Sequence, residues 1–428
     1  MRLESRHQPS TTNGTHSRLR AGCAMARPLA TSRKTSAWQA LLWLVPIALV
    51  VRMTVFIRRR SAGEAFDTVD SFALVQIVIV GLSLLALLAV VRTRSSLKVL
   101  AGTAAGALLS YYALCAVSAL WSPKLVYSAY RAVEVITQFL LIYVAVSYCR
   151  NFPAAERTVL LCSALVVLLE HVARIRLSGV AVSEVPAYSI AAPMIFCYCV
   201  GEFFQAARGR RRMLLLCGVL SFVAVAMGIC ATSIIATICG FVTAAMCHRT
   251  RLRPLLGLLL LAIVVIYLSG AFDTFEDMAF GIVFPGKSQG TVAGLHGRLN
   301  IWSICLDEIM ESPVFGHGFV VTTRVLGVGN GAHNALVQVA LDTGLIGIGL
   351  FLYGVLRLIR EAVLALRMAA PGSVGCLAAF AAASVQSMAT PFVAGSWGAP
   401  TFVFTAILAF FTLYVFPGRS PLARASDM

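Results

Sequence analysis

Long apolar runs separated by short polar segments dominate this chain. A run of about 20 mostly apolar residues can cross a bilayer as a helix. The pattern predicts twelve such helices, over 38–57, 71–91, 98–120, 126–148, 157–173, 186–206, 213–230, 232–247, 254–272, 335–356, 374–393 and 399–416. The run from Met213 to Cys247 is too long for one crossing, so we expect a tight hairpin near Gly228–Ser233. The predicted fold is therefore an all-α integral membrane protein.

Composition supports this fold class. Hydrophobic residues make up 59% of the 428 residues and charged residues 12%, whereas soluble domains have about 45–50% and 25%. A soluble enzyme, a disordered chain and a coiled coil are thereby excluded. The net charge of +17 would suggest nucleic acid in a soluble protein, but membrane proteins keep Lys and Arg in cytoplasmic loops that face anionic lipid. We expect membrane lipid and no nucleic acid as a partner. The twelve Cys show no metal or redox spacing, so we expect no disulfide, no metal and no cofactor.

The distribution of Lys and Arg orients the chain. If the N-terminus is cytoplasmic, most of these residues fall in cytoplasmic segments, as the positive-inside rule requires, with Arg58–Arg60 as the exception. We therefore expect both termini in the cytoplasm. No apolar signal segment precedes residue 38, so we expect no cleavable signal peptide, and Met25 is an alternative start to Met1. The expected divisions are a disordered basic tail (1–37), helices one to nine (38–271), one long outer loop (272–334), helices ten to twelve (335–417) and a cytoplasmic tail (418–428).

The long outer loop contains most of the unusual polar residues. A loop of this length in a compact protein is usually functional. Residues 297–312 have helical periodicity and are followed by Pro313, which ends a helix. The apolar positions predicted to share one face are Leu299, Trp302, Cys305, Leu306 and Ile309. We expect this helix to lie in the membrane interface with Trp302 at headgroup depth.

Two further features follow in the loop. A glycine-rich turn containing Gly316 and Gly318 comes after Pro313. His333 and Asn334 then precede the apolar helix that begins at Ala335. The N-terminus of a helix is a natural anion site, because its free backbone N–H groups and its dipole favour negative charge.

These residues carry a resemblance to a known family. The loop is similar to the domain shared by the O-antigen ligases and the Wzy-type O-antigen and exopolysaccharide polymerases. The positions that match its pattern are Gly297-Arg298, Trp302, Pro313, Gly316, Gly318, His333-Asn334, Gly344 and Gly347. Upstream, Trp121-Ser122-Pro123 and Arg131 resemble the family's outer loop between the third and fourth helices. The resemblance covers about 120–420 and fits the predicted order of helices.

The resemblance implies a function. Family members transfer a glycan from undecaprenyl diphosphate to an acceptor at the periplasmic face of the bacterial inner membrane. The acceptor is lipid A–core sugar for a ligase and another lipid-linked glycan for a polymerase. The resemblance further implies a fold similar to the GT-C glycosyltransferases, a periplasmic location for the long loop, and metal-independent attack of the acceptor hydroxyl on the anomeric carbon.

This chemistry assigns roles to residues of the loop. Arg298 is the expected catalytic cation, because a guanidinium can neutralise charge growing on a diphosphate. His333 is the expected acceptor base or diphosphate ligand. The expected substrate-binding residues in the loop are Asn334, Trp302, Gly316 and Gly318.

The chain departs from the family at one position. Family members often have Ser-Arg near the outer end of the eighth helix, and that arginine is thought to hold the diphosphate. Here the stretch is Ala231-Thr232-Ser233-Ile234. Arg131, Arg174 or Arg176 could supply the missing charge from neighbouring outer segments, and these three complete the predicted substrate-binding set.

Structural roles compete with these assignments. Arg298 could anchor the loop at lipid headgroups, and His333 could cap its helix. His317 has the character of a loop residue, and Asp307, Glu308 and Glu311 that of a solvated helix face, although one of the acids could act as the base. Arg131 and Glu134 lie one turn apart and could form an ion pair inside the membrane. The rival function is a polytopic transporter or flippase of envelope glycolipids, and a non-catalytic scaffold is a second rival.

Overall fold

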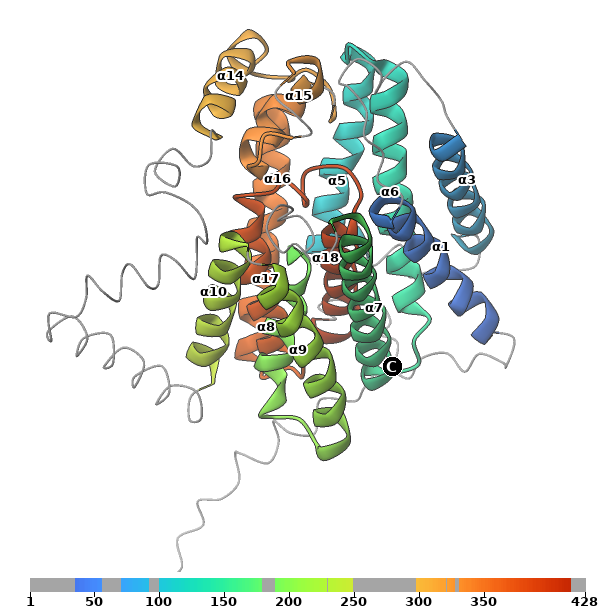
Figure 1. Cartoon of the computed structure of the whole chain (residues 1–428), viewed down its shortest axis with the longest axis vertical. Coiled ribbons are helices and arrows are strands. Elements are labelled where there is room, and N and C mark those ends of the chain that lie inside the picture. Colours follow the sequence, from blue (N-terminus) through green and yellow to red (C-terminus); the bar gives the residue numbers. More distant parts are fainter. Residues whose placement is uncertain are drawn as a thin grey trace, which may run out of the picture.

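The computed structural model of the chain is a bundle of helices (Figure 1). It describes residues 35–55, 71–91, 100–178, 189–228, 230–248, 298–320, 322–327 and 331–416. The described residues contain helices and no strand, in agreement with the predicted all-α class.

The helices follow the apolar runs. From the N-terminus they are α1 (Thr35–Val55), α3 (Ser71–Val91), α5 (Ala104–Val117) continued by the 3-10 turn η1 (Ser118–Trp121), α6 (Leu125–Ser147), α7 (Phe152–Ser178), α8 (Ala192–Phe203), α9 (Arg208–Gly228) and α10 (Ala231–Cys247). After the long loop begins they are α14 (Arg298–Glu311), α15 (Thr322–Val325), α16 (Ala335–Arg367), α17 (Ser373–Ser387), α18 (Ala399–Phe410) and the π-helical turn η4 (Phe411–Val415). The predicted span over 254–272 lies outside the described residues.

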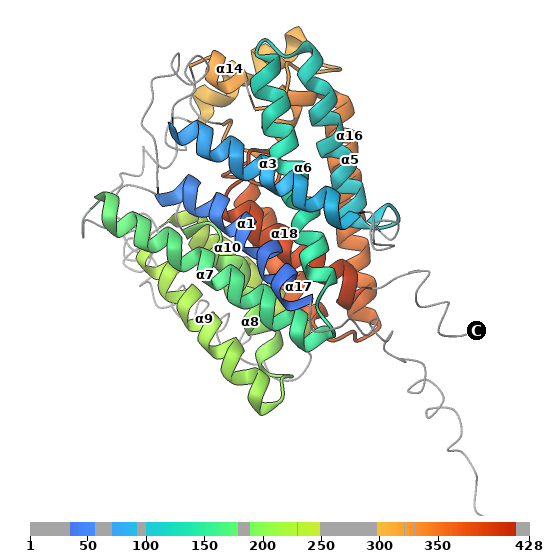
Figure 2. The ribbon, with the colours of Figure 1, turned by 90° about the vertical axis from the view of Figure 1, so that its right-hand side faces the viewer.

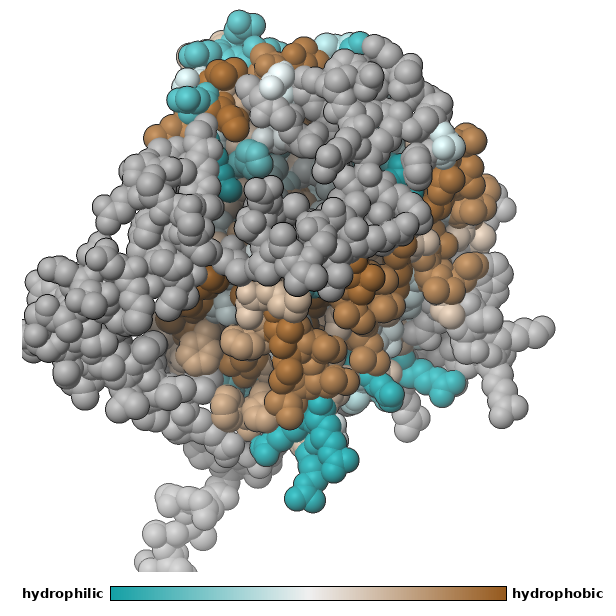
Figure 3. Space-filling model, in the orientation of Figure 1, coloured by the Kyte–Doolittle hydropathy of each residue, from teal (hydrophilic) through white to brown (hydrophobic). Residues whose placement is uncertain are grey.

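The exposed surface of the bundle is suited to lipid. Five of the described helices are long and apolar enough to cross a membrane: α5 with η1, α6, α7, α9 and α16. The remaining apolar helices are shorter, and the count of twelve spans remains a prediction. Large apolar side chains point outward, such as Leu85 on α3 and Leu216 on α9. Figure 3 shows apolar side chains over the middle of the molecule and hydrophilic ones gathered toward its two ends.

The helices pack around a buried α18. Helices α3, α1, α7 and α9 lie side by side in an oblique row (Figure 2). Helix α16 packs along α5, while α17 packs between α8 and α10. Every residue of α18 from Thr401 to Phe410 is buried, so this helix forms the centre of the core.

The loop helix α14 covers one end of the bundle, where η1 and the start of α6 also lie (Figures 1 and 2). The indole Nε1 of Trp121 donates to the carbonyl oxygen of Phe315 at 3.2 Å. The Ser128 hydroxyl donates to the Phe319 carbonyl at 3.0 Å, and the Phe319 amide donates to the Ser118 hydroxyl at 3.2 Å. The loop is therefore attached to the bundle through one exposed and two buried hydrogen bonds and is part of the packed structure.

Candidate functional site

Helix α16 is broken near its start, and the glycine-rich turn of the loop fills the break. Gly344 has φ 62° and ψ −159°, which interrupts the helix. Four backbone hydrogen bonds join the two segments: His317 N to Leu341 O at 2.9 Å, Gly318 N to Asp342 O at 2.9 Å, Leu345 N to Pro313 O at 2.8 Å and Ile346 N to Val314 O at 3.4 Å. The break leaves the amides of Leu345 and Ile346 without their usual helical partners, and the turn supplies the missing acceptors. We call this arrangement the loop joint.

The loop joint requires two of the glycines that the sequence pattern singled out. A Cβ atom on Gly344 would lie 2.4 Å from the carbonyl carbon and oxygen of Val314, and one on Gly316 would lie 2.5 Å from the Thr343 amide nitrogen. Both glycines also have positive φ, a region that other residues rarely adopt. Gly318 packs equally closely on Ser122. The predicted substrate role of Gly316 and Gly318 remains a prediction, whereas their packing role is visible.

Helix α14 packs on α16 through one apolar face. Cys305 is fully buried in a cluster with Ala332 and Leu341, and Ile301 and Ile309 pack at its edge. The sequence pattern had placed Leu299 and Leu306 on this same face. The structure instead leaves Leu299 and Leu306 about half exposed, at 49% and 54%. Helix α14 thus has two apolar faces, of which one is buried against the protein and the other is open.

Trp302 on α14 positions the segment that precedes His333. Its indole Nε1 donates to the Ala332 carbonyl at 2.8 Å. The amide of Ala332 in turn donates to Gln338 Oε1 at 2.9 Å, and Gln338 Nε2 donates to Asp342 Oδ1 at 2.9 Å. Both Gln338 and Asp342 are buried. This chain of bonds fixes the start of α16 to α14.

The structure brings Arg298 and His333 together, although they come from different segments. His333 is half-buried, and its backbone has φ 53°. Burial lowers the pKa of His333 below its ordinary value of 6.5, the nearby Arg298 guanidinium lowers it further, and a hydrogen bond to the Ala389 carbonyl opposes the shift. This shift favours the neutral ring, in which one nitrogen donates to Ala389 and the other can accept a proton.

Asn334 has a defined structural task. Its side-chain Oδ1 accepts from the amides of Leu336 at 2.9 Å and Val337 at 3.3 Å, so it is the N-cap of α16. Capping by Asn is strongly stabilising because it satisfies amides that the first turn leaves unpaired. The predicted contact of Asn334 with substrate is untested. The capping role that had been considered for His333 belongs to Asn334.

The predicted ion pair of Arg131 is confirmed. Arg131 Nη1 lies 2.8 Å from Glu134 Oε2 on α6, and the Arg131 guanidinium also stacks over the Tyr127 ring. Glu134 is fully buried and accepts a second bond from Gln76 of α3 at 2.6 Å. Arg131 is thus directed toward a carboxylate on its own helix. Arg174 lies in the last turns of α7, but its side chain and that of Arg176 are outside the described residues.

A neutral hydrogen-bond cluster stands where family members often have an arginine. The Ser233 hydroxyl lies 3.0 Å from that of Ser189 and accepts from Gln386 Nε2 at 2.8 Å. Ser233 is fully buried. This position joins α10 to α17 and carries no charge.

A cavity of about 460 Å³ lies between the end of α14 and the loop after η1. Its lining residues are Trp121, Pro123, Glu308, Ser312, Gly316, His317 and Val325. The sequence indicated a polar loop position for His317 and a solvated helix face, or an alternative base, for Glu308. Glu308 and His317 line the same cavity because the loop joint holds the turn beside α14. A pattern of neighbouring residues in the sequence could not have indicated this contact.

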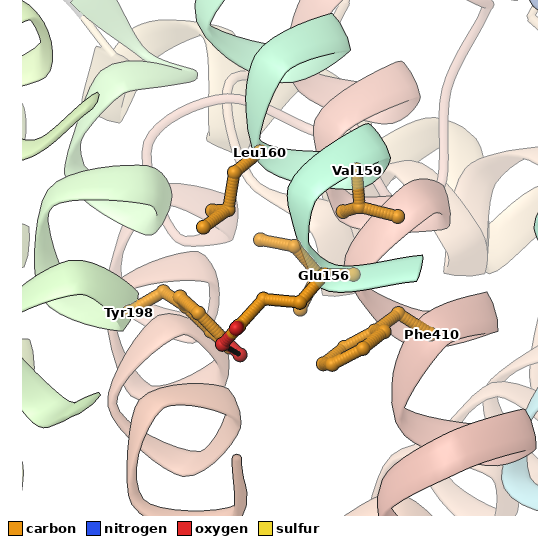
Figure 4. A pocket seen from close by; sticks show the side chains of 6 residues that line it. Glu156, Val159, Leu160, Tyr198 and Phe410 are labelled. Atoms are coloured by element: carbon orange, nitrogen blue, oxygen red, sulfur yellow. Dashed lines mark hydrogen bonds between the residues drawn. The ribbon is translucent and has the colours of Figure 1, made fainter. Parts of the chain in front are cut away.

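The opposite end of the bundle has a different cluster, shown in Figure 4. Glu156 of α7 points toward Tyr198 and accepts from its hydroxyl at 2.5 Å. It also accepts from Arg210 Nε at 2.7 Å. Arg210 also bonds to Glu202 at 2.7 Å. These bonds connect α7, α8 and α9, so the cluster has a structural role. Within the described ranges no group of three or more His, Cys, Asp or Glu could hold a metal ion.

Comparison with known proteins bears directly on the loop and its partner helices. Residues 203–352 match the family model described as O-antigen ligase. This match confirms the resemblance predicted from the sequence over that stretch, which includes α14, the loop joint, Arg298 and His333. No curated protein matches the chain. Together with the five long apolar helices, the match indicates a membrane protein that acts on lipid-linked glycans.

Proposed function

We propose that the protein transfers a glycan from undecaprenyl diphosphate to an acceptor hydroxyl at the periplasmic face of the bacterial inner membrane. It would act as an O-antigen ligase, with lipid A–core sugar as acceptor, or as an O-antigen or exopolysaccharide polymerase, with a lipid-linked glycan as acceptor. The observation that carries this proposal is that Arg298 lies near His333, whose lowered pKa favours the neutral ring, inside the stretch that matches the O-antigen ligase model.

The proposed reaction starts at the acceptor. The acceptor oxygen attacks the anomeric carbon of the donor sugar while the bond from that carbon to the diphosphate oxygen breaks. His333 takes the hydroxyl proton on the ring nitrogen that does not donate to Ala389. A base must be unprotonated to do this, and the burial of His333 and the nearby Arg298 charge keep it so. Products are the extended acceptor and undecaprenyl diphosphate.

The leaving diphosphate gains negative charge, which a fixed cation would stabilise. Arg298 lies at the N-terminus of α14 and close to His333. Its guanidinium can offer two parallel N–H donors to phosphate oxygens. In this proposal one residue therefore serves two purposes: it stabilises the leaving group and it suppresses protonation of the base. Attack without a metal remains part of the proposal.

A transporter or flippase is the competing proposal, because charged pairs inside membrane spans are typical of transport pathways. The pair Arg131–Glu134 would then carry the function. Its contacts favour a structural role, since Gln76 occupies the second carboxylate oxygen and Tyr127 stacks on the guanidinium. The two functions predict opposite sensitivities: loss of His333 would stop glycan transfer, and loss of the Arg131–Glu134 pair would stop transport.

The test compares wild type with His333→Asn in nanodiscs. Asparagine suits this position because it tolerates positive φ and cannot act as a base. Each protein receives undecaprenyl-diphosphate glycan with lipid A–core or lipid-linked glycan as acceptor, and the release of undecaprenyl diphosphate is measured. Asp307→Asn, on the exposed face of α14, is the matched control.

We expect release by wild type and by Asp307→Asn and none by folded His333→Asn. The acceptor that gains mass would then distinguish a ligase from a polymerase. Equal release by His333→Asn would remove His333 from the mechanism. If no donor and acceptor pair gave release by wild type, the proposed function would be wrong.

A further inference from the structure

The cavity at the end of α14 has the size of a ligand site. Its volume of about 460 Å³ lies within the range of roughly 300–1,000 Å³ usual for small-molecule sites. It is distinct from the Arg298–His333 pair. Glu308 is ten residues after Arg298 on α14, which at a rise of about 1.5 Å per residue places it about 15 Å away along the helix.

One wall of this cavity is an oriented aromatic ring. Trp121 is 37% exposed, and its Nε1–H is already used in the bond to Phe315. The Phe315 ring meets it edge-on, with centroids 5.9 Å apart and an interplanar angle of 72°. These two contacts hold the indole in place. The electron-rich face of such a ring attracts the weakly positive C–H groups on one side of a sugar ring.

The other wall is polar. His317 Nε2 lies 2.8 Å from the Glu308 backbone oxygen, which means that this nitrogen carries the hydrogen. The second nitrogen, Nδ1, lies 3.6 Å from Glu308 Oε1, too far for a hydrogen bond. Both side chains are partly exposed, at 19% and 23%. The Ser312 hydroxyl donates to Gly316 O at 3.0 Å and retains its lone pairs. The Glu308 carboxylate and the Ser312 hydroxyl can therefore accept from ligand hydroxyls.

We propose that this cavity binds a sugar unit of the glycan substrate at a distance from the reacting bond. A flat aromatic wall opposite a carboxylate and a histidine is the combination that suits a pyranose ring, whose faces are apolar and whose edge is rich in hydroxyls. The identification of the bound sugar as part of the substrate rests on the proposed function. The binding of a sugar in this cavity does not depend on it. The glycan could belong to the donor or to the acceptor, and the two sources can be separated experimentally.

A remote subsite has a specific kinetic signature. Contacts with non-reacting parts of a substrate contribute to rate only for substrates long enough to reach them. The transfer rate of a short glycan that reaches only as far as His333 should not change when the cavity, about 15 Å away along α14, is altered. A longer glycan should respond. The length at which sensitivity begins identifies the substrate that occupies the cavity.

The kinetic test uses Glu308→Gln and Trp121→Phe, with Asp307→Asn as the control beside Glu308. Rates are measured for acceptors of one sugar and of several sugars, and separately for donors of both lengths. We expect Glu308→Gln to lower kcat/KM about tenfold or more for one long substrate, as loss of a charged hydrogen-bond acceptor does, and to leave both short substrates unchanged. If Glu308→Gln slows transfer only to long acceptors, the acceptor occupies the cavity. If it slows transfer only from long donors, the donor occupies it. Equal loss for short and long substrates would overturn the proposal.

A binding test separates this proposal from the proposed function. Soluble oligosaccharide freed from its lipid is added to wild type, Trp121→Phe and His333→Asn in nanodiscs, and tryptophan fluorescence is recorded. We expect saturable change in wild type and His333→Asn, and loss of that change in Trp121→Phe. Binding without any transfer activity would sustain the subsite while the proposed function failed. No saturable change in wild type would overturn the subsite even if transfer were observed.

Discussion

Replacing Gly344 with alanine tests whether the loop joint holds the candidate site together. The new Cβ atom would lie 2.4 Å from the carbonyl carbon and oxygen of Val314, a distance that a backbone neighbour cannot accommodate by small movements. Gly344 also has φ 62° and ψ −159°, where alanine is strained. Gly349 on the same helix is the matched control, because no described atom lies within 4 Å of its Cβ position.

The expected magnitude follows from these contacts. Strain at this backbone conformation costs about 1–3 kcal/mol. Moving Val314 away from Gly344 breaks the two bonds beside it, from Leu345 to Pro313 and from Ile346 to Val314, at about 1 kcal/mol each. The docked state of the loop should therefore lose roughly 3–5 kcal/mol of stability relative to an open state in which the loop has left α16. The population of that open state should then rise about a hundredfold or more. Gly349→Ala should be neutral or stabilise α16 by about 0.5–1 kcal/mol.

Cys305 reports on docking. It is fully buried between α14 and α16, and burial, assisted by the carboxylates of Asp342 and Glu308, raises the pKa of its thiol to about 11. Alkylation requires an accessible thiolate, so Cys305 should react slowly in wild type. A membrane-impermeant maleimide, followed by peptide mass mapping, measures the rate at this cysteine.

We expect labelling of Cys305 to be about a hundredfold faster in Gly344→Ala and unchanged in Gly349→Ala. Thermal unfolding in nanodiscs verifies that both variants retain the bundle. Wild-type labelling kinetics in a folded Gly344→Ala protein would refute the reasoning, because the loop would then dock without the joint.

Three further outcomes are expected. Arg298→Gln should raise the pKa of His333 toward its ordinary value by removing a like charge, so the acid limb of the pH–rate profile should move to higher pH; an unmoved limb would contradict the coupling. Glu134→Leu should destabilise the protein by about 3–5 kcal/mol because it leaves the largely buried Arg131 guanidinium without its carboxylate partner, and adding Arg131→Met should restore much of the loss in thermal unfolding. Asn334→Ser should keep activity and stability while Asn334→Ala loses about 1 kcal/mol of stability; equal loss of activity in both would instead favour a substrate contact.

Much of the helical architecture could be predicted from the sequence, because long apolar runs have few alternatives in a membrane. The helix before Pro313 was expected over 297–312 and spans Arg298–Glu311. The pair Arg131–Glu134 was expected from spacing of one turn and is present. Both depend on contacts within one helix.

The features that could not be predicted depend on contacts between distant segments. The break at Gly344 lies inside an apolar run that is typical of an uninterrupted helix, and only the turn that fills it makes the break stable. The spacing of apolar residues along α14 predicts a helix. It cannot show which of them face the protein, because α14 has one apolar face against the protein and a second apolar face that is exposed. Leu299 was therefore assigned to the wrong face.

The loop joint is made from main-chain atoms, and this has a consequence for protein engineering. The four bonds that hold the turn against α16 involve only amides and carbonyls. Apart from the glycines, the turn can exchange an exposed side chain such as that of Val314 without altering how it is attached. A grafted loop that retains Pro313, Gly316 and Gly318 should therefore seat against Gly344 in the same register, which makes this loop a practical unit for building chimeras with altered glycan specificity.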